Sequence, residues 1–163
     1  MQYTAKAPRT YETHLRITQI LDGDSLKVAS IFNKNEKEIR LYGLDAPENK
    51  RNRKLREEEK KTQVAGEFLI HLGQLATKFV LSIAPPGTNV TIITEEANFY
   101  DFYRRQLAYV ILPDGSCLNE ILIREGYARP EPEYQCEMLP EYERLNFIAK
   151  QSKSGLYELL NRF

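Results

Sequence analysis

The strongest constraint on the fold lies between residues 13 and 44, where three short segments rich in β-branched and aromatic residues follow one another. The segments read HLRITQIL, SLKVASIF and EIRLYGL, and only the turns Asp22-Gly23-Asp24 and Asn33-Lys34-Asn35 separate them. Residues of these types favour strands, and short turns join strands that run antiparallel. We therefore expect an antiparallel three-stranded meander at the start of the chain.

The pattern then becomes helical. Apolar residues recur at three- and four-residue steps between positions 64 and 79, and Pro85-Pro86-Gly87 ends the run, which predicts a helix over about residues 62–83 that packs on the sheet. Two more strands are predicted in NVTIIT and RQLAYVIL, followed by a short helix near 118–125 and a last helix near 140–153. This order is typical of an α+β fold, a five-stranded, partly open β-barrel of oligonucleotide-binding type with about three helices.

Length and charge limit the domain organisation and the function. A chain of 163 residues fits one domain, which we place at residues 13–163 after an N-terminal extension at 1–12. Residues 49–61 are almost wholly charged, so we expect a mobile surface loop that supplies no core. Lys plus Arg equals Asp plus Glu, at 23 each, and this is not the basic footprint of a sequence-specific DNA-binding protein.

Composition also indicates the surroundings of the chain. Two cysteines do not make a disulfide framework or a zinc cluster, so both are expected to be free thiols. The first residues lack the apolar stretch of a signal peptide, and no segment reaches the apolar length that spans a bilayer. We expect a soluble monomer with no membrane contact, cytoplasmic unless a signal peptide has been removed.

Four carboxylates lie where the predicted strands begin or end. Asp24 shares a strand face with Leu26 and Val28, which places it at the inward rim of the barrel. The segment LYGLDAPE bends at its glycine and proline and so holds two acidic residues at a strand exit. The candidates for one oxygen-rich cluster are Asp22, Asp24, Asp45 and Glu48.

Such a cluster, without His or Cys, favours a hard cation such as calcium or magnesium over zinc. The alternative is that Asp-Gly-Asp and Asp-Ala-Pro-Glu are simply turns, and spacing alone favours that alternative. Two arginines, Arg40 and Arg105, stand in or at predicted strands, and a guanidinium group binds two phosphate oxygens at once. For either arginine alone, a solvated side chain or a structural ion pair is the simpler interpretation.

Taken together, the segments DGDSLKV, IRLYGLDAPE, YRRQLAYV and DGSCLNEILIREGYAR resemble, in order, the motifs of the staphylococcal nuclease (thermonuclease) family over about residues 13–129. The resemblance implies an oligonucleotide-binding barrel with three helices. It also implies a calcium-dependent endonuclease that acts on DNA and RNA and leaves 3′-phosphate ends.

Carried over by position, the resemblance implies a role for each residue. Asp24, Asp45 and the backbone carbonyl of Ala46 would bind one calcium ion, and Asp22 would support them. Glu48 would orient or deprotonate the attacking water, and Arg40 and Arg105 would hold the phosphate. Tyr103 would lie beside the bound nucleotide, and Tyr134 is a candidate for a second tyrosine on the substrate side.

The chain also departs from the family pattern. Phe102 stands where the type member has a lysine, Arg104 replaces a glycine, Ala46 replaces a threonine, and residues 130–142 align poorly. Barrels of this kind hold single or locally melted strands with weak base preference. The rings of Tyr100, Phe102 and Tyr103 could provide faces for base stacking, and packing on the barrel rim is the alternative. A catalytically inactive module of this family that binds nucleic acid or protein is the main competing function, and a barrel with no nucleic-acid role is a third.

Overall fold

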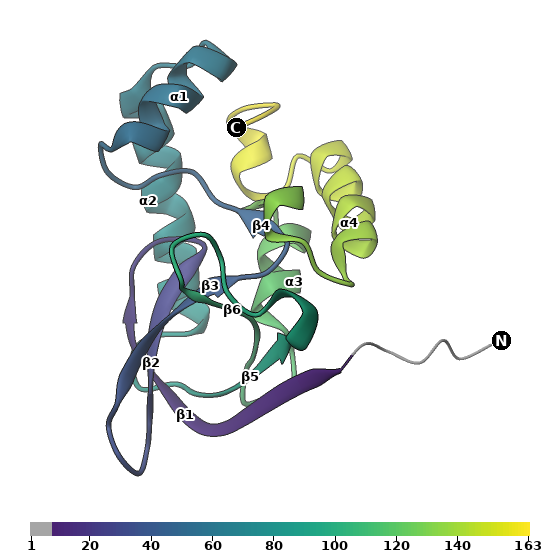
Figure 1. The fold of residues 1–163 in the computed structure, drawn as a ribbon. Helices are drawn as coiled ribbons and strands as arrows, with labels where there is room; N and C mark the ends of the chain where they lie inside the picture. Colours follow the sequence, from purple (N-terminus) through teal and green to yellow (C-terminus); the bar gives the residue numbers. More distant parts are fainter. Residues whose placement is uncertain (1–7) are drawn as a thin grey trace, which may run out of the picture.

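Five strands close into a barrel in the order β1-β2-β3-β6-β5 in the computed structural model, which describes residues 8–163 (Figure 1). The predicted meander is formed by β1 (Arg9–Ile20), β2 (Ser25–Ser30) and β3 (Glu36–Leu41). The second antiparallel pair is β5 (Asn89–Glu95) with β6 (Gln106–Ile111), and parallel pairing of β3 with β6 joins the two parts. The α+β barrel fold is therefore confirmed.

The barrel is closed, whereas the sequence predicted a partly open one. The reason is β1, whose twelve residues pair with β2 along one part and with β5 along the other. The register of the β1–β5 pair shifts between Glu12 and Leu15, and His14 within this irregularity has a φ of 57°. A bulge of this kind bends a strand and increases its twist, which lets one strand complete the barrel. Residues 9–12 therefore belong to β1, while residues 1–7 of the expected extension lie outside the described residues.

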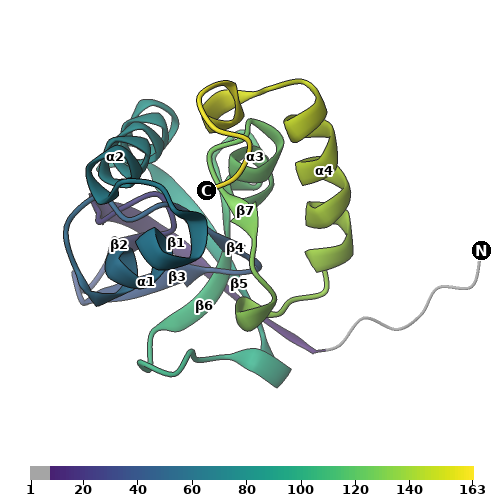
Figure 2. The same cartoon turned by 90° about the horizontal axis from the view of Figure 1, so that it is seen from above.

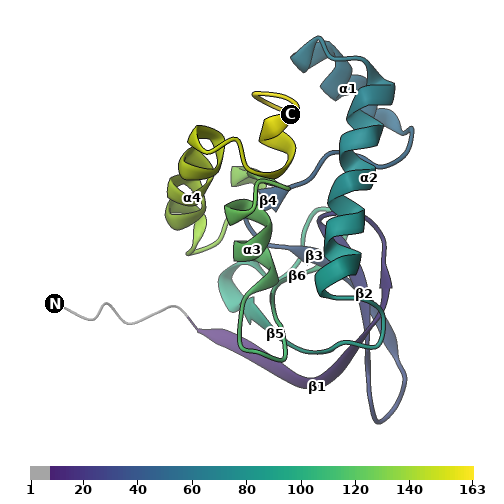
Figure 3. The same cartoon turned by 180° about the vertical axis from the view of Figure 1, so that it is seen from behind.

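The barrel interior is filled by residues that alternate along each strand, as the period of two predicts. Pairs of this kind are Leu26 and Val28 on β2 and Ile39 and Leu41 on β3, each no more than 1% exposed. Helix α2 (Gly66–Ile83) runs beside the barrel and buries Leu69, Leu72 and Ala76 (Figure 3). Because all of these side chains form one continuous apolar cluster, the helix and the barrel share a single core.

The remaining predicted helices are α3 (Leu118–Arg124) and α4 (Leu139–Gln151), each within two residues of its expected bounds. From above, α1 and α2 lie on one side and α3 and α4 on the other, with the short antiparallel pair β4 (Leu44–Asp45) and β7 (Arg129–Pro130) between them (Figure 2). Three short 3-10 helices complete the described chain: η1 (Glu96–Asn98), η2 (Pro132–Tyr134) and η3 (Gly155–Glu158).

Helix α1 (Arg53–Thr62) occupies the segment that was expected to be a mobile loop, so residues 8–163 contain four α-helices rather than three. Its N-cap is Asn52, whose side chain accepts a hydrogen bond from the Leu55 amide at 2.9 Å. Leu55 is fully buried and anchors the helix in the common core. Lys60 and Lys61 in the last turn suit the negative end of the helix dipole. The buried Leu55 and favourable interactions at both ends of the helix thus stabilise a segment that is otherwise almost wholly charged.

Both cysteines are free, as predicted: Cys117 is partly buried and Cys136 is buried. Among residues 8–163, no single helix is long and apolar enough to cross a membrane. The bent pair of α1 and α2 meets that length and composition only when its two parts are added across a 113° bend.

Candidate active site

A cleft of about 770 Å³ opens at the end of the barrel between α1, the segment before β6, β7 and the last residues of the chain. The predicted site residues that line it are Asp22, Asp24, Arg40, Asp45, Glu48, Tyr103, Arg105 and Tyr134. Ala46, which is 2% exposed, is not among the residues that line the cleft, although its neighbour Asp45 is. The structure therefore brings together eight side chains that are as far as 112 positions apart in the sequence.

Two glycines allow the acidic turns to approach each other and α2. A Cβ atom on Gly23 would lie 2.7 Å from the Ala46 Cβ and 2.9 Å from the Ala76 Cβ, so only glycine fits in the Asp-Gly-Asp turn. A Cβ atom on Gly73 of α2 would lie 2.2 Å from the Glu48 carbonyl oxygen. These contacts hold the segment after β4 between the turn and the helix.

Asp24 and Asp45 are joined through Arg40 at the floor of the cleft. Arg40 Nη2 lies 3.3 Å from Asp24 Oδ2 and 3.1 Å from Asp45 Oδ1, and all three residues are no more than 4% exposed. The amide of Ala46 donates to Asp24 Oδ2 at 2.9 Å, and Asp22 Oδ1 accepts from the Asp24 amide at 3.0 Å. Burial raises the pKa of Asp24 to about 6, although the charge of Arg40 opposes this.

The guanidinium group of Arg40 is largely committed to the protein. Its Nη1 donates to the carbonyl oxygens of Asp24, Leu41 and Leu44 at 3.0–3.3 Å, and its Cζ lies 3.9 Å from the centre of the Tyr134 ring. Burial opposes the charge of Arg40, but the neighbouring aspartates outweigh burial and raise its pKa. Arg40 thus neutralises buried carboxylates, and Tyr134 covers it with one ring face.

Arg105 is held differently and is more exposed, at 24% of its side chain. Its Nε donates to Asp101 Oδ2 at 2.8 Å, and its Nη1 lies 3.5 Å from Glu38 Oε1. The Asp101 carboxylate also accepts from the Arg105 amide at 2.8 Å, so a single aspartate fixes both the backbone and the side chain. Arg105 therefore lines the cleft with a guanidinium group that Asp101 and Glu38 hold in place.

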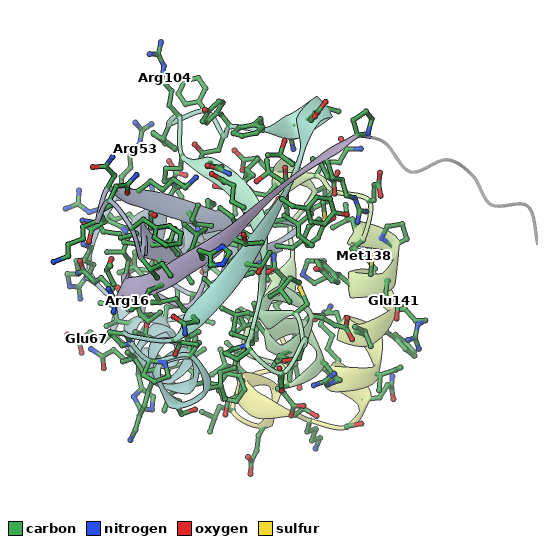
Figure 4. The ribbon with its side chains drawn as sticks, turned by 90° about the horizontal axis from the view of Figure 1, so that it is seen from below. Arg16, Arg53, Glu67, Arg104, Met138 and Glu141 are labelled. Atoms are coloured by element: carbon green, nitrogen blue, oxygen red, sulfur yellow. The ribbon has the colours of Figure 1, made fainter. Side chains whose placement is uncertain are left out.

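The aromatic residues before β6 are exposed, which excludes the alternative that they pack on the barrel rim. Tyr100, Phe102 and Tyr103 are 60%, 91% and 73% exposed, and the rings of Phe102 and Tyr103 meet edge to face with centroids 5.5 Å apart. Arg104, whose φ is 62°, follows them in the sequence and projects outward at the top of the view in Figure 4. This tip of the molecule offers flat apolar surface next to the cleft.

Two cations that sequence reasoning missed complete the site. Lys54 Nζ lies 2.5 Å from Asp45 Oδ1 and 3.0 Å from Glu48 Oε1, and Arg129 Nη2 lies 2.7 Å from Asp45 Oδ2. Arg129 is the last residue of the fourth motif, so it was within reach of the sequence argument. Lys54 was one basic residue in a charged run, and only the formation of α1 places it.

Glu58 of α1 lies against the same cations. Its Oε1 is 3.9 Å from both Lys54 Nζ and Arg129 Nη2. Burial raises the pKa of Glu58 to about 7, and the neighbouring charge of Asp45 adds to this effect. The wall formed by α1 therefore carries less negative charge at neutral pH than its sequence suggests.

The donors at the cleft floor are of the type that a hard cation prefers, because all of them are oxygen atoms. Within residues 8–163, however, no group of three or more His, Cys, Asp or Glu side chains is arranged to hold a metal ion. The distances show why: the carboxylates of Asp45 and Glu48 are turned toward Lys54, whose ammonium group stands in for a cation between them. The donor chemistry fits a metal ion, provided that Lys54 moves aside.

Comparison with known proteins shows which family the chain resembles. Residues 38–158 match the model of a family described as "Staphylococcal nuclease homologue". A protein of Escherichia coli O157:H7 named "Uncharacterized endonuclease" is 28% identical over 146 residues, which are 90% of this chain and 78% of the relative. Endonuclease YhcR of Bacillus subtilis (strain 168) is 29% identical over 145 residues, 86% of this chain but only 11% of that protein. The family match leaves out β1, β2, Asp22 and Asp24, but it includes β5, β6 and helices α1 to α4. Because it spans more than half of the chain, the chain belongs to the staphylococcal nuclease homologue family.

Proposed function

We propose that this chain is a calcium-dependent endonuclease that hydrolyses phosphodiester bonds of DNA or RNA and leaves 3′-phosphate ends. Family membership and the relatives named as endonucleases support nuclease activity. The observation that carries the proposal is the convergence of Asp24, Asp45, Glu48, Arg40 and Arg105 in one cleft. Each of these residues alone has a simpler explanation, but a set of carboxylates beside two arginines suits phosphoryl chemistry.

The metal-binding residues of this proposal are Asp24, Asp45 and the backbone carbonyl of Ala46, with Asp22 holding the Asp24 amide. A bound calcium ion would supply positive charge and orientation at the phosphate, as metal Lewis acids do in general. Asp24 and Asp45 are already held by Arg40, which pairs with both buried carboxylates and keeps them close together.

Glu48 is the candidate for holding and deprotonating the attacking water. Its side chain is 13% exposed, so it is partly shielded yet faces the cleft. A weak nucleophile such as water gains from a carboxylate that takes its proton as it attacks. The close contact of its backbone with Gly73 fixes the segment that carries it.

Arg105 is the candidate for binding the phosphate as negative charge builds on its oxygens. Hydrogen bonds that strengthen in the transition state raise the rate rather than only the affinity. Arg40 contributes its charge from the cleft floor. Phe102 and Tyr103 at the tip suit stacking with unpaired bases, which favours a single-stranded or locally melted substrate bound by one copy of the chain.

A second function has one observation in its favour. Both oxygens of Asp45 are already paired with cations of the protein, as in a module that binds nucleic acid or protein without cleaving it. The two functions differ in whether added calcium produces cleavage.

The test is a digestion series on single-stranded DNA, duplex DNA and RNA, with calcium, magnesium or chelator, followed by analysis of the product ends. We expect cleavage with calcium, none with chelator, and 3′-phosphate ends. Cleavage only with magnesium and 5′-phosphate ends would contradict the metal and the bond that is broken. Binding without cleavage under every condition would support the inactive module.

A further inference from the structure

Lys54 occupies a special position because its ammonium group contacts two of the three carboxylates that the proposed reaction needs, Asp45 and Glu48. It lies 2.5 Å from the oxygen of Asp45 that also contacts Arg40, and 3.0 Å from Oε1 of Glu48. Burial opposes the charge of Lys54, but Asp45, Asp24 and Glu48 outweigh it and raise its pKa, so the side chain carries its charge.

Helix α1 also contacts the other oxygen of Glu48. The N-cap residue Asn52 donates from Nδ2 to Glu48 Oε2 at 2.5 Å. Both oxygens of the glutamate are thus bound by groups from the first turn of α1. In this arrangement each side-chain oxygen of Glu48 already has a protein partner, and these partners compete with a water molecule.

The helix is fixed, but the lysine side chain is not. Leu55 is fully buried next to Lys54, and Asn52 caps the helix, so α1 stays against the core. The Lys54 side chain is 40% exposed and has a flexible four-carbon stem. Rotation of this stem can therefore remove the ammonium group from Asp45 Oδ1 and Glu48 Oε1 without unfolding any part of α1, while Arg40 and Arg129 stay paired with Asp45.

We propose that Lys54 is a built-in competitor of the divalent cation. It neutralises Asp45 and Glu48 while the metal is absent, and it rotates toward solvent when a divalent ion binds at Asp45, which leaves Glu48 Oε1 open to water. The inference rests on the proposed function for the identity of the ion and its ligands. It predicts that Lys54 lowers the affinity for calcium and, in exchange, stabilises the metal-free protein.

The test compares Lys54→Met with wild type and with Lys60→Met, which makes the same charge change on the same helix away from the cleft. Calcium binding is measured by titration calorimetry without nucleic acid. Loss of the competing cation should lower the dissociation constant at least tenfold, or about 1.4 kcal/mol. Lys60→Met should stay within twofold of wild type. In chelator, Lys54→Met should melt at a lower temperature than Lys60→Met, and calcium should raise its melting temperature more.

The outcomes separate this inference from the proposed function. If Lys54→Met binds calcium no more tightly than wild type, or if neither protein binds it at millimolar concentration, Lys54 is not a competitor, whether or not wild type cleaves nucleic acid. If affinity rises as expected but no protein cleaves, the competitor role stands and the nuclease proposal fails. Should Lys54→Met not fold in chelator, Lys54→Gln, which keeps a polar side chain, decides the comparison by the same tenfold criterion.

Discussion

Arg40 and Arg105 carry the same guanidinium group, but they differ in how many hydrogen bonds and ion pairs they form within the protein. Arg40 is 2% exposed, and it bonds three backbone carbonyls and two buried carboxylates. Arg105 is held mainly by Asp101 and keeps part of its guanidinium group toward the cleft. Removing one partner of a buried ion pair costs about 3–5 kcal/mol, whereas removing a partly exposed partner costs much less. The family resemblance implied the same role for the two arginines, whereas in the structure they differ in burial and in their partners.

Arg105→Ala should therefore reduce cleavage about a thousandfold or more, by analogy with arginines that stabilise phosphoryl transfer, and leave the melting temperature within a few degrees of wild type. Arg40→Ala should reduce both activity and stability, because it leaves the buried carboxylates of Asp24 and Asp45 without this partner. Thermal unfolding beside a rate assay distinguishes the two. An Arg105→Ala protein that retains a tenth of the wild-type rate would remove this residue from catalysis, and an unchanged melting temperature for Arg40→Ala would show that its ion pairs add no net stability.

Among the elements, α2 does more than cover the barrel. Its Gly73 lets the helix contact the carbonyl of Glu48, and its Ala76 contacts the turn that carries Asp24. The proposed water-activating residue is therefore positioned through its backbone by a helix that supplies no predicted site residue. Any bulk added at this contact must push the Glu48 segment or the helix away.

Gly73→Ala should destabilise the protein by about 1–3 kcal/mol, the range for overpacking, despite the better helix propensity of alanine. Gly66→Ala in the same helix is the matched control. There the added Cβ meets only the flexible side chain of Glu59, which can move. Chemical denaturation of both variants gives the difference in free energy of unfolding. Equal stabilities for the two would mean that the Glu48 segment adjusts without cost and does not depend on α2.

An element could be predicted from the sequence when the residues that indicate it lie within that element. The strands and the helices α2, α3 and α4 were found because their apolar periods are local. Helix α1 was missed because its only core contribution is Leu55, and one residue makes no period. Closure of the barrel depends on an irregularity near His14 that the residue type does not indicate. Seven of the eight cleft residues lie in the ordered motifs, and Tyr134 was a candidate from a segment that aligns poorly with the family. Lys54 required the tertiary position of a helix that the sequence did not show.

At the scale of the whole molecule, charge is balanced both overall and within the cleft. The chain has a formal net charge of zero, and the side chains lining the cleft comprise seven basic and eight acidic residues. Nucleic acid is a polyanion whose affinity for proteins comes largely from the phosphates that basic groups neutralise. A balanced cleft gives little net attraction by itself. A divalent ion at the carboxylates would change the sign of that balance.

We therefore expect binding of a single-stranded oligonucleotide to require the metal. Fluorescence anisotropy with Glu48→Gln, which should bind without cleaving, compares calcium with chelator at matched ionic strength. Calcium should tighten binding at least tenfold. The salt dependence should be shallow, because each phosphate neutralised adds only about 0.7 to the slope and most basic side chains of the cleft are already paired with carboxylates. Equal affinity in chelator would mean that the protein's own cations attract the strand, with exposed Arg53 at the cleft edge as the first residue to replace.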